Sequence, residues 1–235
     1  FHFLAYLFAA AGLFGCFSLF QANQLAQIIQ DQIFVPLDLF SQNPMKGQLL
    51  IGVLLAGIIS LVIFGGIRRI GQVAARLVPA MVLLYMFCGL FILLGNIANL
   101  DDIFLLIIND AFTGHAVAGG TLGTVMITGI RRAAFSNEAG IGTESMAHGA
   151  AITKEPVREG LVAMLGPMID TLVVCSVTGF AILSTGVWMD PNLNGISMTS
   201  AAFKEGLPFM GETMLLIIVS IFSITTIIGY SYYGS

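Results

Sequence analysis

Residues 133–151, "AAFSNEAGIGTESMAHGAA", gather Ser136, Asn137, Glu138 and His148 among alanines and glycines in a chain that is otherwise strongly apolar. Ser and Asn compete for backbone hydrogen bonds and Gly permits unusual dihedral angles, so "SNEAGIG" is typical of a helix break. A break at membrane depth is tolerated where the backbone lines a cavity, and its bare peptide groups can hold a charged solute. The alternative is a cytoplasmic loop followed by a surface helix, "ESMAHGAA".

A second polar group lies in the apolar run near the start of the chain. Gln21 and Gln24 are three residues apart and Asn23 and Gln27 are four apart, so part of the set forms a stripe along one helix. Amides in hydrocarbon are costly unless they face protein or a cavity. The stripe therefore either joins neighbouring helices or lines a binding cavity.

A third polar group lies near the other end, in "FSITTIIGYSYYG". Thr226 and Tyr230 are four residues apart and share a helix face. Thr225 and Thr226 offer hydroxyl and carbonyl oxygens, which suit an alkali cation by analogy with other hard cations. The competing interpretation is that both hydroxyls bond back to carbonyls of their own helix.

Several titratable side chains fall within apolar runs. An Arg at mid-bilayer costs roughly 2.5–3.5 kcal/mol. Arg131 and Arg132 therefore either reach an interface near the end of a helix, or face a watery cavity or pair with Glu138 or another acid. For Asp170, an ion pair with Arg131 or Arg132 is favoured over a cation or proton site. For His148, a structural hydrogen bond is favoured. An intramembrane hydrolase using Glu138, His148 and Asp170 is the enzyme alternative, but no HExxH or GxSxG motif is present.

The composition indicates a polytopic membrane protein. Of the 235 residues 57% are hydrophobic and 9% are charged, and the mean hydropathy is +0.94. A soluble domain carries roughly 25% charged residues, so this chain cannot cover its surface with charge. The net charge of −4 gives no indication of a nucleic-acid partner, and the three cysteines lie in apolar runs without metal-binding spacing.

The apolar runs predict an all-α bundle within one transmembrane domain, residues 1–235. A spanning helix needs about 20 mostly apolar residues. The predicted spans are residues 3–26, 48–67, 77–97, 117–151 (interrupted), 161–184 and 213–232. The chain begins and ends within apolar helices, and we therefore expect it to be an internal fragment of a larger protein.

Lys and Arg residues predict the orientation. The connectors after the second and fourth spans carry most of them: Arg68, Arg69, Arg76, Lys154 and Arg158. The opposite connectors carry only Lys46 and Lys204 together with several aspartates. The positive-inside rule places the first set in the cytoplasm, so the first span runs outward.

Three ordered stretches resemble the sodium:alanine (alanine or glycine:cation) symporter family. They are "GIRRAAFSNEAGIGTESMAHGAA" with "KEPVREGLVAMLGPMIDTLVVC", "FSLFQANQLA" (17–26) and "FSITTIIGYSYYG" (222–234). The resemblance covers essentially the whole chain. Departures from the usual pattern are Ala133 in place of Gly, residues 143–146 in place of small residues and Pro, and Tyr230 in place of Trp.

The resemblance implies a leucine-transporter-like architecture of two inverted five-helix repeats. This chain would then supply core helices 3–8, with a broken helix near residues 129–142. Core helices 1, 2, 9 and 10 would belong to missing parts of the same protein. The protein would be a multi-pass protein of the plasma membrane, and specifically of a bacterial inner membrane.

The resemblance also implies site residues. For the substrate these are Gln21, Asn23, Gly129, Ser136, Asn137, Thr226 and Tyr230. Sodium would be held by the Phe222 carbonyl with Thr225 and Thr226.

The implied function is sodium-coupled symport of a small neutral amino acid, alanine or glycine, by alternating access, without enzymatic chemistry. The implied partners are the amino acid, the co-transported sodium ion and the lipid bilayer. An ion channel is the remaining rival, but channels present repeated pore loops or charged rings, and neither is visible.

Overall fold

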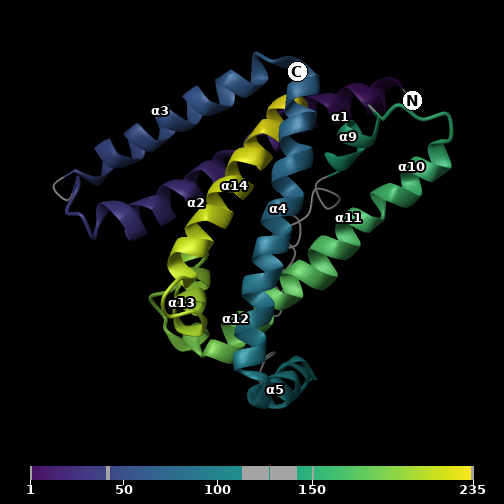
Figure 1. Ribbon diagram of the computed structural model, residues 1–235. Coiled ribbons are helices and arrows are strands. Elements are labelled where there is room, and N and C mark those ends of the chain that lie inside the picture. The colour runs from purple at the N-terminus through teal and green to yellow at the C-terminus, as the bar shows by residue number, and fades with distance from the viewer. Residues whose placement is uncertain (1, 41–42, 113–126, 128–141, 150, 234–235) are drawn as a thin grey trace. The chain divides into compact units, whose positions relative to one another are not determined.

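The computed structural model describes residues 2–40, 43–112, 127, 142–149 and 151–233, and every regular element in these ranges is a helix (Figure 1). The chain divides into two compact units. The first comprises Phe1–Ile92 with Val187–Ser235, and the second Leu93–Gly186.

The first unit is built around α14 (Gly211–Tyr233), drawn in yellow in Figure 1. It packs against α2 (Leu19–Ile29), α3 (Pro44–Ile63) and α13 (Ile196–Gly206). The remaining helical elements of this unit are α1 (His2–Gly15), the π-helical turn η1 (Gln30–Phe34), α4 (Gly66–Gly95, as far as Ile92) and the 3-10 turn η4 (Val187–Met189).

The core of this unit follows helical spacing. Ile51, Leu55 and Ile59 of α3 are four residues apart and buried, so they form one face of that helix. Leu215 and Ile218 are the buried counterparts in α14. Packing of these buried faces joins α3 to α14, one of the helices that carry the candidate site.

The first predicted span, residues 3–26, falls on two helices rather than one. α1 ends at Gly15 and α2 begins at Leu19, and the helix is interrupted at Cys16–Ser18. Gly is a weak helix former, so Gly15 favours the end of α1, and Ser18 precedes α2 without a side-chain capping bond. Gln21 therefore lies in the first turn of α2, next to the interruption.

The second unit contains one long helical segment, from α10 (Pro156–Ala163) through α11 (Leu165–Pro167) and the π-helical turn η3 (Met168–Val174) to α12 (Cys175–Thr185). The π turn follows Pro167, which lacks an N–H donor and disturbs the preceding turn. The unit also contains the 3-10 turn η2 (Ile97–Asn99), α5 (Leu100–Phe112) and α9 (Glu144–Gly149). The predicted helix break near residues 129–142 lies outside the described residues, apart from Gly142.

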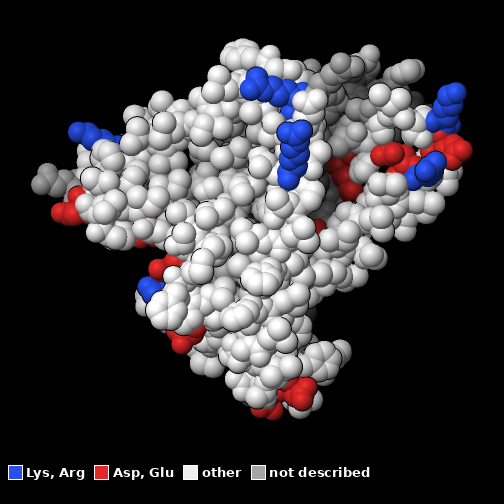
Figure 2. All heavy atoms as spheres, in the orientation of Figure 1, with Lys and Arg blue, Asp and Glu red and all other residues white. Residues whose placement is uncertain are grey.

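Four helical segments of the described part are long and apolar enough to cross a membrane: Pro44–Ile63, Arg69–Gly95, Pro156–Thr185 and Gly211–Ser231. Large apolar side chains such as Leu61, Leu83 and Leu172 are exposed along them. Charged side chains are sparse on the face shown in Figure 2. Because lipid is the solvent that accepts such a surface, the chain is a multi-pass membrane protein.

The turn between α13 and α14 is closely packed. Phe203 of α13 is 1% exposed, so this helix is docked rather than lying free on the surface. A Cβ on Gly206 would come within 2.7 Å of the Ile92 side chain, and one on Gly211 would overlap the backbone carbonyl of Phe203. Only glycine fits at these two positions.

Replacing Gly211 with alanine is expected to lower the free energy of unfolding by about 1–3 kcal/mol, because a backbone carbonyl cannot swing aside as a side chain can. Thermal unfolding of the full-length protein in detergent measures this. Gly179→Ala in α12 is the matched control, since a Cβ there meets nothing within 4 Å. Equal unfolding midpoints for the two variants would contradict the packing described for this turn.

Candidate functional site

Gln21 is the buried polar residue of α2. Its relative exposure is 8%, and it shares the buried face of the helix with Leu25 and Ile28, four and seven residues further on. Its side-chain oxygen has no hydrogen-bond partner among the described residues. A buried amide without a partner is costly, so its position indicates a ligand or a further protein group that completes it.

Asn23, two residues further on, is exposed on the other side of α2. Gln24 is half-buried, and its side-chain oxygen lies close to Gly195, just before α13. Of the two predicted substrate contacts in this helix, the structure turns Gln21 inward and Asn23 outward.

In α14, Ser223, Thr225 and Tyr230 are buried, with relative exposures of 1%, 8% and 5%. Thr226 is half-buried, and the Phe222 side chain is exposed. The role expected of Phe222 uses its backbone carbonyl, which does not depend on that side chain. The Tyr230 ring also contacts that of Tyr233, with centroids 5.9 Å apart.

The Thr225 hydroxyl lies 2.9 Å from the Ile221 carbonyl oxygen and 3.0 Å from that of Phe222, and donates to them. This is the back-bonding that the sequence left open as the alternative. A hydroxyl has one proton but two lone pairs, so donation to the helix leaves the Thr225 oxygen free to coordinate a cation. Two of the three predicted sodium ligands, the Phe222 carbonyl and Thr225, thus lie 3.0 Å apart.

Since α2 packs against α14, the structure brings together the helices that carry Gln21, Thr225, Thr226 and Tyr230. The other predicted substrate residues, Gly129, Ser136 and Asn137, lie outside the described residues, as do Arg131, Arg132 and Glu138.

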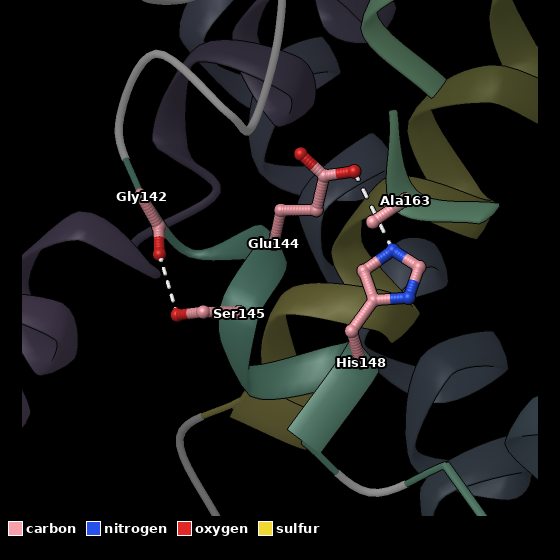
Figure 3. Close-up of a pocket in the computed structure, with 5 residues that line it drawn as sticks. All are labelled: Gly142, Glu144, Ser145, His148 and Ala163. Atoms are coloured by element: carbon pink, nitrogen blue, oxygen red, sulfur yellow. Dashed lines mark hydrogen bonds and ion pairs between the residues drawn. The ribbon is translucent and has the colours of Figure 1, made fainter. Parts of the chain in front are cut away.

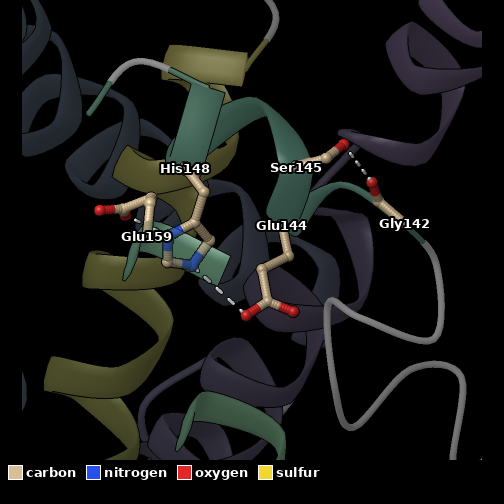
Figure 4. A network of polar contacts seen from close by, with 5 residues as sticks. All are labelled: Gly142, Glu144, Ser145, His148 and Glu159. Carbon is tan, nitrogen blue, oxygen red and sulfur yellow. Dashed lines mark hydrogen bonds and ion pairs between the residues drawn. The ribbon is translucent and has the colours of Figure 1, made fainter. Parts of the chain in front are cut away.

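A separate polar cluster lies in the second unit, around α9. His148 Nδ1 lies 2.7 Å from Glu159 Oε1, and His148 Nε2 lies 3.4 Å from Glu144 Oε1 (Figures 3 and 4). The structural hydrogen bond expected of His148 is therefore present. The sequence did not point to Glu159, because its partner His148 lies eleven residues away across a turn. The only indication was that Glu159 is an acidic residue in the first turn of the helix that begins at Pro156.

Thr143 was also not identified. It is 2% exposed, and its hydroxyl oxygen has no hydrogen-bond partner among the described residues. It follows Gly142, whose φ of 89° is one that glycine adopts readily. Its only signal in the sequence was that residues 143–146 depart from the usual pattern of the family they resemble.

Apolar helices long enough to span a membrane, with a few buried polar groups among them, are features typical of the membrane-transporter class. The profile of the Sodium:alanine symporter family matches residues 2–235, and the chain belongs to this family. It is thus one of a family of transporters and not of enzymes.

The chain is similar to several known proteins. It is 37% identical to an uncharacterized transporter of Haemophilus influenzae, over 98% of this chain and 50% of the relative. It is 36% identical to a probable sodium/glutamine symporter of Bacillus subtilis, over 80% of this chain and 39% of the relative. It is 36% identical to a sodium/alanine symporter of Methanococcus maripaludis, over 97% of this chain and 48% of the relative. The chain thus spans half or less of the length of these relatives.

Proposed function

We propose that the protein containing this chain is a sodium-coupled symporter of a small neutral amino acid, alanine or glycine. Family membership and the names of the relatives support sodium-coupled amino-acid transport. The structural observation that carries the proposal is the buried amide oxygen of Gln21, which has no hydrogen-bond partner among the described residues. Gln21 lies beside the interruption of the first span and on a helix packed against α14.

In this proposal Gln21 binds the substrate. A zwitterionic amino acid has no route through lipid, so each of its charged groups needs polar partners inside the protein. The Gln21 amide both donates and accepts, and the hydroxyls of Thr226 and Tyr230 add to it. Backbone groups near Gly129, Ser136 and Asn137 would meet the carboxylate, and Asn23 would take part only where another segment covers its exposed face.

Sodium is bound by oxygen atoms of α14. Thr225 and the Phe222 carbonyl are already adjacent, and Thr226 follows them in the chain. Neutral oxygens in a half-buried setting suit a hard cation. In this proposal the α14 residues hold the coupling ion next to the amino acid.

Transport then proceeds by alternating access between two inverted repeats. In this arrangement α1 with α2 is the counterpart of α14. Each begins its polar stretch with a Phe-Ser pair, Phe17-Ser18 in the one and Phe222-Ser223 in the other. A ligand shifts a conformational equilibrium only through its differential affinity for the two states, so joint occupancy by sodium and amino acid drives the change.

Uptake of labelled alanine and glycine by the full-length protein in proteoliposomes tests this function. A symporter gives uptake that saturates in both sodium and amino acid. A channel passes current without the amino acid, and a hydrolase moves neither solute. Either of those results would overturn the proposal.

A further inference from the structure

A cavity of about 250 Å³ lies in the first unit, where the chain turns from η1 into α3. The residues that line it include Gln30 and Phe34 of η1, Asp38 and Phe40 of the connector, and Pro44 at the start of α3. Cavities that hold drug-sized ligands usually measure about 300–1,000 Å³. This cavity therefore suits a smaller group of a few heavy atoms.

The aromatic side of the cavity is fixed by packing. The Phe34 and Phe40 rings lie with their centroids 5.2 Å apart and their planes tilted by 57°. A Cβ on Gly47 would come within 2.9 Å of the Phe34 ring, so glycine at this position lets α3 pack closely against the two rings. Asp38 and Phe40 have φ angles of 52° and 60°, which a bulky side chain such as Phe rarely adopts. Backbone strain of this kind is concentrated where proteins hold ligands.

The polar groups at the cavity include both donors and an acceptor. Gln48 donates its Nε2 to Gln30 Oε1 at 3.3 Å, which leaves the NH₂ group of Gln30 as a donor. Asp38 contributes an exposed carboxylate, which accepts. Lys46 lies in the first turn of α3, is exposed, and forms no ion pair within the described part of the chain. A ligand that carries both an ammonium and an anionic group matches these charges.

The cavity lies at the end of a membrane span. Pro44 lines it and is also the first residue of the spanning helix Pro44–Ile63. Leu50, Leu54 and Ile58 follow on α3 at four-residue spacing and are exposed, as expected for a helix face in contact with acyl chains. The end of a span lies at the level of the lipid headgroups. The bilayer therefore keeps headgroups beside this cavity, whereas a dissolved ligand has to reach it from water.

We propose that this cavity binds the headgroup of an ethanolamine phospholipid. The ammonium donates to Asp38, and the phosphate accepts from Gln30 and Lys46. The two methylene groups between ammonium and phosphate pack against the rings of Phe34 and Phe40. A primary ammonium has three N–H donors, whereas the quaternary ammonium of a choline lipid has none and a glycerol lipid has no cation. The cavity therefore prefers the ethanolamine lipid, and this binding is independent of the proposed transport function.

Native mass spectrometry of the full-length protein in detergent measures the affinity for each lipid. The probes are dioleoyl phosphatidylethanolamine, phosphatidylcholine and phosphatidylglycerol, which share their acyl chains and differ in the headgroup. Wild type is expected to bind the ethanolamine lipid about tenfold more tightly than the other two, because only this headgroup donates hydrogen bonds to the carboxylate from a charged group. Glycerophosphoethanolamine, which has the same headgroup without acyl chains, is expected to bind more weakly than the lipid.

Asp38→Asn is expected to bind the ethanolamine lipid about tenfold more weakly than wild type and to lose the preference for it. Asparagine adopts positive φ values readily, so this variant keeps the turn. Asp102→Asn is the matched control, since Asp102 is an exposed aspartate of α5 that does not line the cavity, and it should bind all three lipids as wild type does. Lys46→Gln is expected to weaken all three by about threefold, because each of them has a phosphate.

Equal affinity of wild type for the three lipids would overturn the headgroup site, and this comparison needs no variant. Asp38→Asn binding the ethanolamine lipid as tightly as wild type would also overturn it. If Asp102→Asn loses the preference to the same extent, overall surface charge selects the lipid and the cavity does not. Glycerophosphoethanolamine that binds as tightly as the lipid would assign the cavity to a dissolved ligand and contradict the role of the bilayer.

Discussion

Replacing Gln21 with leucine is expected to reduce amino-acid uptake by about 10- to 150-fold while leaving the protein at least as stable as wild type. The loss corresponds to one hydrogen bond to a charged group, worth about 1.5–3 kcal/mol. Stability is retained because the Gln21 amide oxygen is buried without a partner, and burying such a group costs roughly 1–3 kcal/mol in proteins. Uptake kinetics and thermal unfolding of the full-length protein measure the two effects.

Gln32→Leu is the matched control, since Gln32 is a glutamine with a known structural partner. Its amide donates to the Ser200 hydroxyl at 3.0 Å and so joins η1 to α13. Removing it is expected to lower the free energy of unfolding by about 1–2 kcal/mol and to leave substrate affinity close to wild type. If Gln21→Leu unfolds earlier and transports normally, Gln21 joins helices and does not bind substrate.

Replacing Thr225 with valine is expected to raise the sodium concentration needed for half-maximal uptake by about tenfold, equivalent to about 1.4 kcal/mol of lost cation binding. Valine keeps the shape of threonine but lacks the oxygen. The hydroxyl's bonds to the Ile221 and Phe222 carbonyls lie within one helix, and their loss has little effect on stability. The sodium dependence of uptake at saturating amino acid gives the measurement.

Thr185→Val controls for the loss of a back-bonded hydroxyl. Thr185 donates to the carbonyls of Ala181 and Ile182 at 2.9 and 3.2 Å, which is nearly the same geometry at the end of α12. We expect no change in sodium dependence for this variant. An equal shift in both variants would mean that the Thr225 effect reflects helix geometry and not cation coordination.

The helical class and the membrane environment could be predicted from hydropathy alone, because apolar length is what a bilayer requires. The second, third, fifth and sixth predicted spans overlap α3, α4, α10–α12 and α14, respectively. The interruption at Cys16–Ser18 could not be predicted in this way, because Gly15 and Ser18 are only two residues of common types within a long apolar run. Such local breaks depend on packing that a hydropathy window does not contain.

The polar residues of the site were recognisable by type, but their directions were not. Gln21 and Asn23 looked equivalent in sequence, and only the packing of α2 against α14 decides which of them is buried. For Thr225, the sequence could not decide between a hydroxyl that bonds to its own helix and one that binds a cation. The structure shows the first, and the two roles are compatible. Glu159 was missed because its contact with His148 depends on how α9 and α10 pack.

Equilibrium binding of labelled alanine to the purified full-length protein, with and without sodium, tests the central claim most directly. We expect saturable binding that requires sodium, that is lost in Gln21→Leu, and that needs more sodium in Thr225→Val. Binding that is independent of sodium, or that is as tight in Gln21→Leu as in wild type, would contradict the assignment of α2 and α14 as the transport site.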